Sequence, residues 1–240
     1  MRITGVDEFA FVTSLNEKYY NLCGKEMLER FEEHMGGYPL YLYNEDFEPD
    51  HNVILQGWNL GDHYEDFVSR HNKKKDIHIV RFSKKAFSII HAMDNVKCKK
   101  LIWIDADCFV NKTIPLDLLQ DLSPRKILSS HFNVWHTKNG VRYRSCETGF
   151  FILNKGHKQF TKFADKYKHI YYNDITDNLR RFYDGDVYGE VLNQLPDSIQ
   201  KDLNPRSDVK SPISRSILKE YLCHYKSKGL KSRVFDQTQQ

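Results

Sequence analysis

The sequence lacks the features that would place it in several common classes of protein. Its five cysteines are an odd number, and no two of them form a Cys-x-x-Cys pair. This predicts free thiols in a reducing compartment rather than a disulfide framework or a cysteine zinc site. No stretch approaches the ~20 consecutive apolar residues of a membrane span, and the first residues show no signal-peptide pattern. We therefore expect a cytoplasmic protein, with a bacterial or viral origin compatible with that reading.

Several catalytic motifs are also missing. There is no Gly-x-x-x-x-Gly-Lys-Ser/Thr loop, no Gly-x-Gly-x-x-Gly turn, no Gly-x-Ser-x-Gly elbow and no His-Glu-x-x-His pair. These absences argue against a P-loop nucleotidase, a dinucleotide-binding dehydrogenase, an α/β-hydrolase and a zinc protease.

What the chain does have is an ordinary globular composition with an uneven charge. Apolar residues make up 40% of 240 residues, which is enough for a sizeable core. The net charge is +4, while residues 201–240 alone hold nine Lys/Arg and four Asp/Glu, a surplus of +5. A basic segment of this kind suits a phosphate-bearing ligand or nucleic acid, or is simply a solvated tail.

The first half of the sequence alternates apolar runs with amphipathic segments. The expected strands are residues 9–14, 38–43, 77–80 and 101–104, and the expected helices are residues 22–35, a short one near 64–68, and one that Ser83 begins as its N-cap. Strands that alternate with helices predict a mostly parallel central sheet flanked by helices.

The second half changes character. Residues 134–137 and 141–144 flank Asn139-Gly140, a strong signal for a small β-hairpin insertion. Further strands are expected at 126–130 and 148–153, and helices at 160–170, 175–182, 187–195 and 216–222. We expect one domain over residues 1–233, with two halves at about 8–110 and 111–233, and a disordered tail at 234–240.

The most informative stretch is Leu101-Ile102-Trp103-Ile104-Asp105-Ala106-Asp107-Cys108-Phe109-Val110. Four large apolar residues fit a strand buried on both faces, and two acids follow at its carboxyl end, where open α/β sheets hold their ligands. Two hard oxygen donors suit a divalent cation that also grips phosphate. The alternative is a pair of solvated strand-end acids, since a second copy, Asp184-Gly185-Asp186, follows no apolar strand.

Together with two later segments, this motif resembles the GT-A fold of nucleotide-sugar-dependent glycosyltransferases. The segment Cys146-Glu147-Thr148-Gly149-Phe150-Phe151-Ile152-Leu153-Asn154 is similar to the acidic-small-Gly strand that lines the donor–acceptor site in that family. The segment His224-Tyr225-Lys226-Ser227-Lys228-Gly229-Leu230-Lys231 looks like the closing His…Gly…Lys segment of glycogenin-like transferases, with one inserted residue and without the aromatic-rich ending.

The resemblance implies that the half at about 8–110 binds the nucleotide and the half at about 111–233 binds the acceptor, and it implies a set of metal and donor ligands. Asp107 would bind the metal, Asp105 would bind the metal or the ribose, and His224 would complete the protein ligands. One imidazole among oxygen donors favours Mn²⁺ over Mg²⁺ as the bound cation. Further donor-binding candidates come from the strand ends, a following tyrosine, the basic pair before the motif strand, the strand glycine and the closing lysine: Thr13, Ser14, Tyr19, Lys84, Lys85, Gly149 and Lys231. The sequence does not decide between Lys84 and Lys85.

Three acids are candidates for the acceptor side. Asp186 or Asp184 would act as general base if the reaction inverts configuration, and Glu147 would contact the sugar. If the reaction retains configuration, the leaving diphosphate can take the proton and no base is needed; the glycogenin-like ending favours retention. A structural reading remains open for each residue, namely a helix-capping Asp and a hydrogen-bonding Glu.

The resulting hypothesis is a metal-dependent glycosyltransferase that uses a nucleotide-diphosphate sugar, most simply a UDP-sugar. Its acceptor would be a glycan, a lipid-linked saccharide, a protein or a modified nucleic acid, such as a modified DNA base. Two rivals stay open: a nucleotidyltransferase acting on a sugar phosphate, and a non-catalytic nucleic-acid-binding protein that uses the basic C-terminal segment.

Overall fold

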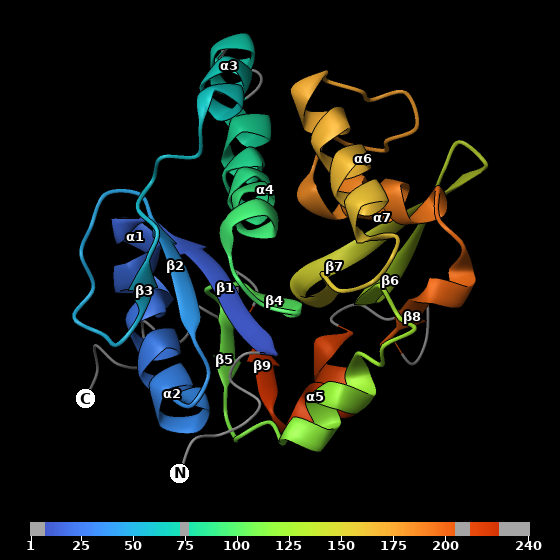
Figure 1. Cartoon of the computed structure of the whole chain (residues 1–240). Helices are drawn as coiled ribbons and strands as arrows, with labels where there is room; N and C mark the ends of the chain where they lie inside the picture. The colour runs from blue at the N-terminus through green and yellow to red at the C-terminus, as the bar shows by residue number, and fades with distance from the viewer. Residues whose placement is uncertain (1–7, 73–76, 205–211, 226–240) are drawn as a thin grey trace.

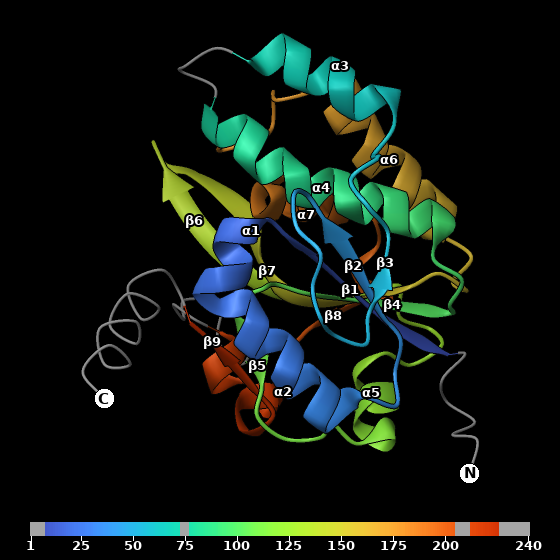
Figure 2. The same cartoon turned by 90° about the vertical axis from the view of Figure 1, so that its left-hand side faces the viewer.

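A computed structural model describes residues 8–72, 77–204 and 212–225. The proposed phosphate ligand Lys231 and the expected tail at 234–240 lie outside these residues. One sheet of seven strands crosses the molecule in the order β3-β2-β1-β4-β7-β6-β8 (Figures 1 and 2). The bounds of these strands in chain order are β1 Phe9–Leu15, β2 Leu40–Asn44, β3 Ile54–Leu55, β4 Lys100–Ile104, β6 Ser129–Lys138, β7 Val141–Asn154 and β8 Gln200–Asp202.

The four strands from β3 to β4 run parallel, as the alternation of strands and helices predicts. Strand β7 runs antiparallel to both β4 and β6, and β8 pairs parallel with β6. A second, two-stranded sheet joins β5 (Cys108–Val110) to β9 (Leu222–His224) in antiparallel register. The mostly parallel α/β prediction is therefore confirmed, and an antiparallel ribbon brings a late segment back beside the end of β4.

Helices cover both faces of the sheet (Figures 1 and 2). On one face lie α3 (Asp62–His71), α4 (Ile77–Asn95), α6 (Phe160–Tyr172) and α7 (Asp184–Asn193). On the other lie α1 (Glu17–Tyr19), the π-helical turn η1 (Tyr20–Gly24), α2 (Lys25–Met35), α5 (Leu116–Leu122) and the β5–β9 ribbon. Short 3₁₀ turns complete the chain at η3 (Asp197–Ile199), η4 (Ile213–Arg215) and η5 (Ile217–Glu220).

Strand β4 shows how this arrangement produces two cores. Leu101 and Trp103 pack on the side of α4, α6 and α7, whereas Ile102 and Ile104 pack on the side of α2 and α5. All four side chains are essentially inaccessible. A strand buried on both faces needs an apolar residue at every position, which is why this segment reads as a continuous apolar run.

Four predicted features are wrong. Residues 77–80, expected as a strand, form the first turn of α4, because a short, mostly apolar segment does not distinguish a strand from a helix. Ser83, expected to cap a helix, lies inside α4 and donates its hydroxyl to the Val80 carbonyl at 2.8 Å. The expected helix at 175–182 is absent from the described chain, and the one at 216–222 is replaced by η5 and β9.

The hairpin at Asn139-Gly140 is confirmed. Both residues have positive φ, 52° and 76°, as a two-residue turn between twisted antiparallel strands requires. The turn joins β6 and β7, which are both long strands of the central sheet. The hairpin is therefore an extension of that sheet and not a separate insertion. Among the described residues, none of the helices has the length and hydrophobicity needed to cross a membrane.

Helix α7 packs against β7 through two glycines. A Cβ atom at Gly185 would lie 2.3 Å from the Cys146 carbonyl oxygen, and one at Gly189 would lie 2.6 Å from the Arg144 carbonyl oxygen. Any side chain at either position would push the helix off the strand. The first turn of α7, which carries Asp184 and Asp186, is therefore fixed against the middle of β7.

This contact predicts the effect of Gly189→Ala. Alanine alone would favour the helix by up to about 1 kcal/mol, but the overlap with the Arg144 carbonyl costs about 1–3 kcal/mol and dominates. We expect a net loss in the free energy of unfolding, measured by urea denaturation. Gly156→Ala is the matched control, since its Cβ would lie 3.4 Å from its nearest neighbour. Equal stability of the two variants would contradict the close approach of α7 to β7.

Candidate active site

The Asp-x-Asp motif forms a tight turn directly after β4. The Asp105 amide donates to the Gly149 carbonyl of β7 at 2.8 Å, and the Cys108 amide donates to the Asp105 carbonyl at 2.9 Å. Asp105 and Asp107 remain half-buried, at the edge where β4 and β7 end their pairing. The turn leads at once into β5.

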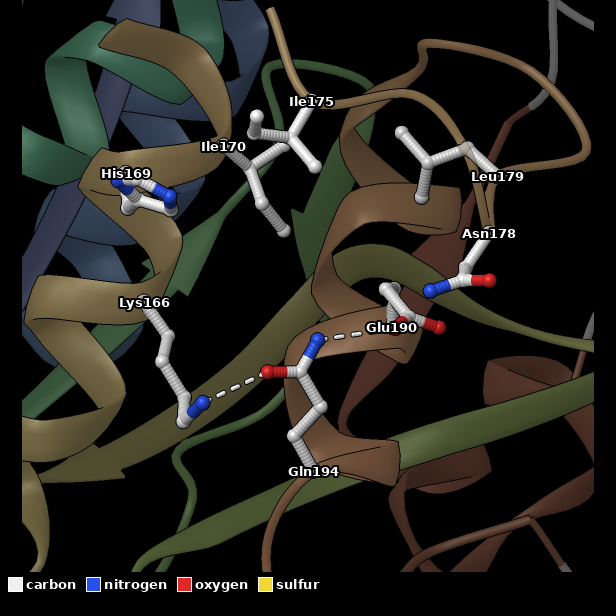
Figure 3. A pocket seen from close by; sticks show the side chains of 8 residues that line it. All are labelled: Lys166, His169, Ile170, Ile175, Asn178, Leu179, Glu190 and Gln194. Atoms are coloured by element: carbon white, nitrogen blue, oxygen red, sulfur yellow. Dashed lines mark hydrogen bonds between the residues drawn. The ribbon is translucent and has the colours of Figure 1, made fainter. Parts of the chain in front are cut away.

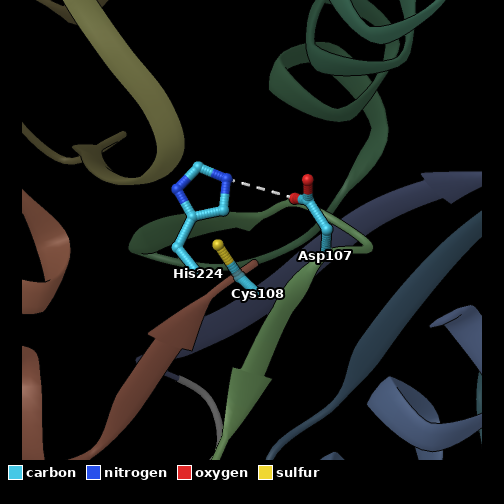
Figure 4. Close-up of side chains that lie close together, drawn as sticks. All are labelled: Asp107, Cys108 and His224. Atoms are coloured by element: carbon cyan, nitrogen blue, oxygen red, sulfur yellow. Dashed lines mark ion pairs between the residues drawn. The ribbon is translucent and has the colours of Figure 1, made fainter. Parts of the chain in front are cut away.

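The β5–β9 ribbon brings His224 to this turn. Cys108 is paired with His224 across the ribbon, and the Tyr225 amide donates to the Asp107 carbonyl at 2.9 Å. The imidazole Nε2 of His224 lies 3.2 Å from Oδ1 of Asp107, with the Cys108 thiol close by (Figure 4). Residues more than 110 positions apart in the chain thus present one nitrogen and one oxygen ligand to the same point.

Gly149 makes room for the imidazole. A Cβ atom there would lie 2.9 Å from Cε1 and 3.2 Å from Nδ1 of His224, and 3.2 Å from the Cys108 sulfur. The glycine of the Glu147-Thr148-Gly149 segment is needed because the histidine ring occupies the space of its missing side chain. Sequence reasoning singled out Gly149 for the donor, and the structure places it directly beside His224.

Glu147 approaches His224 from the other side. Its Oε1 lies 3.8 Å from Nδ1 of the imidazole, too far for a hydrogen bond. The buried Nδ1 has no hydrogen-bond partner within the described residues. Burial alone would lower the pKa of His224, but the hydrogen bond and charge of Asp107, helped by Glu147, raise it above its usual value.

These residues fit a divalent cation. Two donors at adjacent corners of an octahedral site with bonds of about 2.1 Å lie about 3 Å apart, close to the 3.2 Å between His224 Nε2 and Asp107 Oδ1. Burial, with Asp107 and Asp105 nearby, raises the pKa of Cys108 well above that of a free thiol. The thiol therefore stays protonated, and Asp107 with His224 is the pair suited to hold a hard cation.

Asp105 belongs to a second cluster, built on Lys85. The Lys85 ammonium lies 2.6 Å from Oδ1 of Asp105 and 3.1 Å from Oδ2 of Asp184, and it donates to the Thr148 carbonyl at 2.7 Å. The Trp103 indole donates to the same Asp105 oxygen at 2.6 Å, and the Thr148 hydroxyl donates to Asp184 at 2.5 Å. We call these five residues the Lys85 cluster.

The electrostatics of the Lys85 cluster are those of a desolvated ion group. Burial would lower the pKa of Lys85, but the two carboxylates raise it, so the ammonium stays charged. Burial would raise the pKa of Asp184, but Lys85 and the Thr148 hydroxyl hold it below its usual value. For Asp105, burial and the charges of Asp107 and Asp184 outweigh Lys85 and raise the pKa.

Asp186, the other acid on the first turn of α7, is 3% exposed and faces two arginines. Its Oδ1 lies 3.4 Å from a terminal nitrogen of Arg180, and its Oδ2 lies 3.3 Å from Nε of Arg181. The structure therefore separates the two acids: Asp184 belongs to the Lys85 cluster and Asp186 to an arginine pair. Because α7 starts at Asp184, both lie within its first turn rather than between two helices.

The remaining nucleotide-side candidates lie around the end of β1. Thr13 is fully buried, Ser14 and Tyr19 are half-buried, and the Tyr19 hydroxyl accepts a hydrogen bond from Arg81, whose guanidinium lies 5.6 Å from the ring centroid. Lys84 points to Glu45 and not to the acids of the Lys85 cluster. In this structure Lys85 is thus the member of the basic pair that meets Asp105.

Sequence reasoning missed Trp103, Thr148, Arg180 and Arg181. A signal existed for two of them, since Trp103 lies two residues before Asp105 and Thr148 stands inside the quoted Glu147-Thr148-Gly149 segment. The arginines follow no motif and meet Asp186 only through the fold.

A separate pocket of about 90 Å³ lies between α6 and α7 (Figure 3). Lys166 donates to Gln194 at 2.7 Å across its mouth, and Gln194 donates to Glu190 at 2.9 Å. None of the sequence-predicted site residues lines it, so it is separate from the cluster at the end of β4.

Comparison of the three-dimensional structure with solved structures identifies the fold. A glycosyltransferase involved in the glycosylation of the major capsid of PBCV-1 is 18% identical with a TM-score of 0.50, over 94% of this chain and 99% of that one. The galactosyltransferase LgtC, solved with donor and acceptor sugar analogs, is 12% identical with a TM-score of 0.50, over 90% and 86%. The fold is that of the GT-A glycosyltransferases.

The bifunctional glycosyltransferase WbbM shows the same GT-A likeness at 12% identity and a TM-score of 0.52; the match covers 97% of this chain and 45% of WbbM. The sequence itself matches no protein-family profile. It also matches none of the curated proteins. The GT-A resemblance expected from the motifs is thus confirmed by structure, although overall sequence identity to these proteins is only 12–18%.

The Lys85 cluster predicts a large effect of Lys85→Met. Removing the cation leaves the buried Asp184 carboxylate and the half-buried Asp105 carboxylate without their partner, which costs about 3–5 kcal/mol. We expect a loss of this order in the free energy of unfolding at pH 7, measured by urea denaturation. Lys84→Met removes a more exposed pair with Glu45 and should cost at most about 1 kcal/mol. Similar losses in the two variants would show that the cluster is not a desolvated ion group.

The His224–Asp107 pair predicts a pH-dependent contribution to stability. Because the folded-state pKa of His224 is raised, the pair contributes fully below about pH 6.5, and its contribution is lost as the pH rises through the folded-state pKa. In metal-free buffer, the stability difference between the wild type and Asp107→Asn should be largest near pH 6 and shrink above it. Denaturation at several pH values measures this; a difference that grows with pH would contradict the pairing.

Proposed function

We propose that the protein is a metal-dependent glycosyltransferase that moves a sugar from a nucleotide-diphosphate donor, a UDP-sugar in the simplest case, to an acceptor. The observation that carries the proposal is the convergence of Asp107 and His224 at the end of β4. The GT-A fold supports it by analogy. The Lys85 cluster lies beside the same turn, where the Lys85 ammonium is paired with Asp105 and Asp184.

Asp107 and His224 would hold the cation, with Mn²⁺ favoured over Mg²⁺ because one ligand is an imidazole. When bound, the cation supplies Lewis-acid stabilisation of the charge that a departing diphosphate gathers. The Oδ1 atom of Asp105 already accepts from Lys85 and Trp103. Asp105 is not part of the group of potential metal ligands formed by Asp107, Cys108 and His224. We propose that its remaining oxygen binds the metal or the donor ribose.

The chain's own residues supply orientation and charge. Lys85, itself fixed by Thr148, holds Asp105 and Asp184 at the end of β4, so we propose that Asp105 meets the donor site without rearrangement. Gly149 keeps His224 in place by leaving room for its ring. Glu147 stands beside the imidazole, where we propose that it contacts the transferred sugar. Lys231 is proposed to neutralise a phosphate, and Thr13, Ser14 and Tyr19 are proposed to form the base end of the donor site.

The surroundings of the two α7 acids bear on the stereochemistry. A general base works best with a pKa near the working pH, yet the pKa of Asp184 is held low by Lys85 and Thr148 despite its burial. Asp186 is engaged by Arg180 and Arg181. Neither acid is placed as an effective base, which supports a retaining reaction in which the leaving diphosphate takes the acceptor proton. The acceptor classes proposed are a glycan, a lipid-linked saccharide, a protein or a modified nucleic acid.

Donor hydrolysis tests the proposal. The purified protein is incubated with UDP-glucose, UDP-galactose, UDP-N-acetylglucosamine and GDP-mannose, with MnCl₂, MgCl₂ or EDTA, and the released nucleotide is measured. We expect nucleoside diphosphate to be released from one donor with Mn²⁺, and Asp107→Asn or His224→Gln to lower kcat/KM on the order of 100-fold or more. Asp117→Asn, which alters an exposed acid on α5, is the control and should keep wild-type activity.

The products separate the rivals. Release of a nucleoside monophosphate and a sugar 1-phosphate from a nucleotide sugar, or of pyrophosphate from a nucleoside triphosphate and a sugar 1-phosphate, would identify a nucleotidyltransferase. No release from any donor, together with metal-independent DNA binding that weakens steeply with salt, would identify a nucleic-acid-binding protein.

A further inference from the structure

Four polar residues gather beside the β6–β7 hairpin: Arg180, Arg181, Asp186 and His136. The two guanidinium groups share a single carboxylate, that of Asp186. His136 on β6 feels the charges of all three, and its pKa is lowered by burial and by the arginines, against the opposing charge of Asp186. The imidazole is therefore neutral at pH 7, and the local charge is positive.

The arginines retain unused hydrogen-bonding capacity. Their contacts with Asp186, at 3.4 and 3.3 Å, are longer than the 2.7–2.9 Å of strong charge-assisted bonds. The buried Nε of Arg180 has no hydrogen-bond partner within the described residues. This nitrogen is closed to solvent, so an incoming anion would meet the half-exposed Arg181 guanidinium and the exposed part of Arg180.

The second guanidinium is held in position by aromatic rings. The Arg181 guanidinium lies 4.5 Å from the centroid of the Tyr183 ring, and Tyr183 packs on Phe82 at 4.3 Å. Arg181 is nevertheless half exposed. A planar guanidinium that is already stacked loses less conformational freedom when it forms two parallel bonds to a carboxylate or a phosphate.

This group borders the candidate active site. Asp186 lies two residues after Asp184 on the first turn of α7, and Asp184 connects through Lys85 to Asp105. The first turn of α7 is fixed against β7, next to the hairpin (Figure 1). The arginine pair is thus joined to the Lys85 cluster through the first turn of α7, and the Lys85 cluster adjoins the Asp107–His224 pair through the Asp-x-Asp turn.

We propose that Arg180 and Arg181 form an anion subsite that binds a phosphate or carboxylate group of the acceptor sugar. The inference rests on the proposed function and names its acceptor as an anionic saccharide. Asp186 is then the counter-ion that keeps both guanidinium groups in place before the acceptor arrives. The donor diphosphate has its own cationic partners at the end of β4, so the arginines are available to a second anion.

Binding of sugar anions tests the subsite without transfer. Isothermal titration with glucose 6-phosphate, glucuronate, inorganic phosphate and neutral glucose is carried out on protein saturated with UDP and MnCl₂. We expect one or both sugar anions to bind at least tenfold more tightly than glucose, the preferred one showing whether phosphate or carboxylate is recognised. Equal binding of glucose, binding of inorganic phosphate alone, or no binding of any of the four would overturn the proposal.

Variants locate the binding. Arg181→Gln and Arg180→Gln should weaken binding of the preferred sugar anion at least tenfold, and Arg181→Lys, which keeps the charge, should recover part of it. Arg125→Gln removes an exposed arginine after α5 and should bind like the wild type. If the glutamine variants instead weaken UDP binding and leave the sugar anion unaffected, the arginines serve the donor and the proposal is wrong.

The two proposals fail in different ways. If the protein hydrolyses no nucleotide sugar but binds the sugar anion through Arg180 and Arg181, the anion subsite is supported and the glycosyltransferase function is contradicted. If the protein hydrolyses its donor but the wild type and Arg181→Gln bind the sugar anion equally well, the glycosyltransferase function is supported and the anion subsite is contradicted.

Discussion

The structure of this site depends on one buried cation. The Lys85 ammonium joins four elements, because Lys85 comes from α4, Asp105 from the end of β4, Thr148 from β7 and Asp184 from α7. Desolvating two carboxylates beside an apolar strand is unfavourable unless a positive charge meets them. The lysine satisfies both acids at once and thereby fixes the helix α7 relative to the strand that carries the Asp-x-Asp turn. The positions of Asp107 and Asp186 follow from this arrangement.

Much of the fold was predictable because strand burial leaves a direct trace in the sequence. The apolar run from Leu101 to Ile104, the turn at Asn139-Gly140 and the amphipathic spacing of α6 each reflect a local constraint, and each is confirmed. The segment at 77–80 was assigned wrongly because its apolar run is equally compatible with the first turn of a helix that continues to Asn95. Local spacing did not reveal the start of α7 at Asp184, since that start is set by two glycines against β7.

The candidate site was only partly visible for the same reason. Asp105 and Asp107 stand out because acids after a buried strand are locally unusual, and the closing segment supplied His224 by resemblance. The choice between Lys84 and Lys85 depends on which face of α4 meets β4, which the sequence does not specify; in the structure Lys85 takes that position. Arg180 and Arg181 meet Asp186 through the path of an irregular loop, and no periodicity encodes such a path.

The position of His224 on a small separate ribbon has a consequence for motion. Strands β5 and β9 share only three residue pairs and form no part of the seven-stranded sheet, and an isolated two-stranded ribbon is marginally stable. The β5–β9 ribbon is not isolated, however: Phe109, Val110 and Leu222 are essentially inaccessible, so opening it exposes apolar core and is opposed by that packing. A cation shared by Asp107 and His224 would stabilise the β5–β9 ribbon. Amide hydrogen exchange at Cys223 and Tyr225 would therefore report how often the ribbon opens and separates the two ligands.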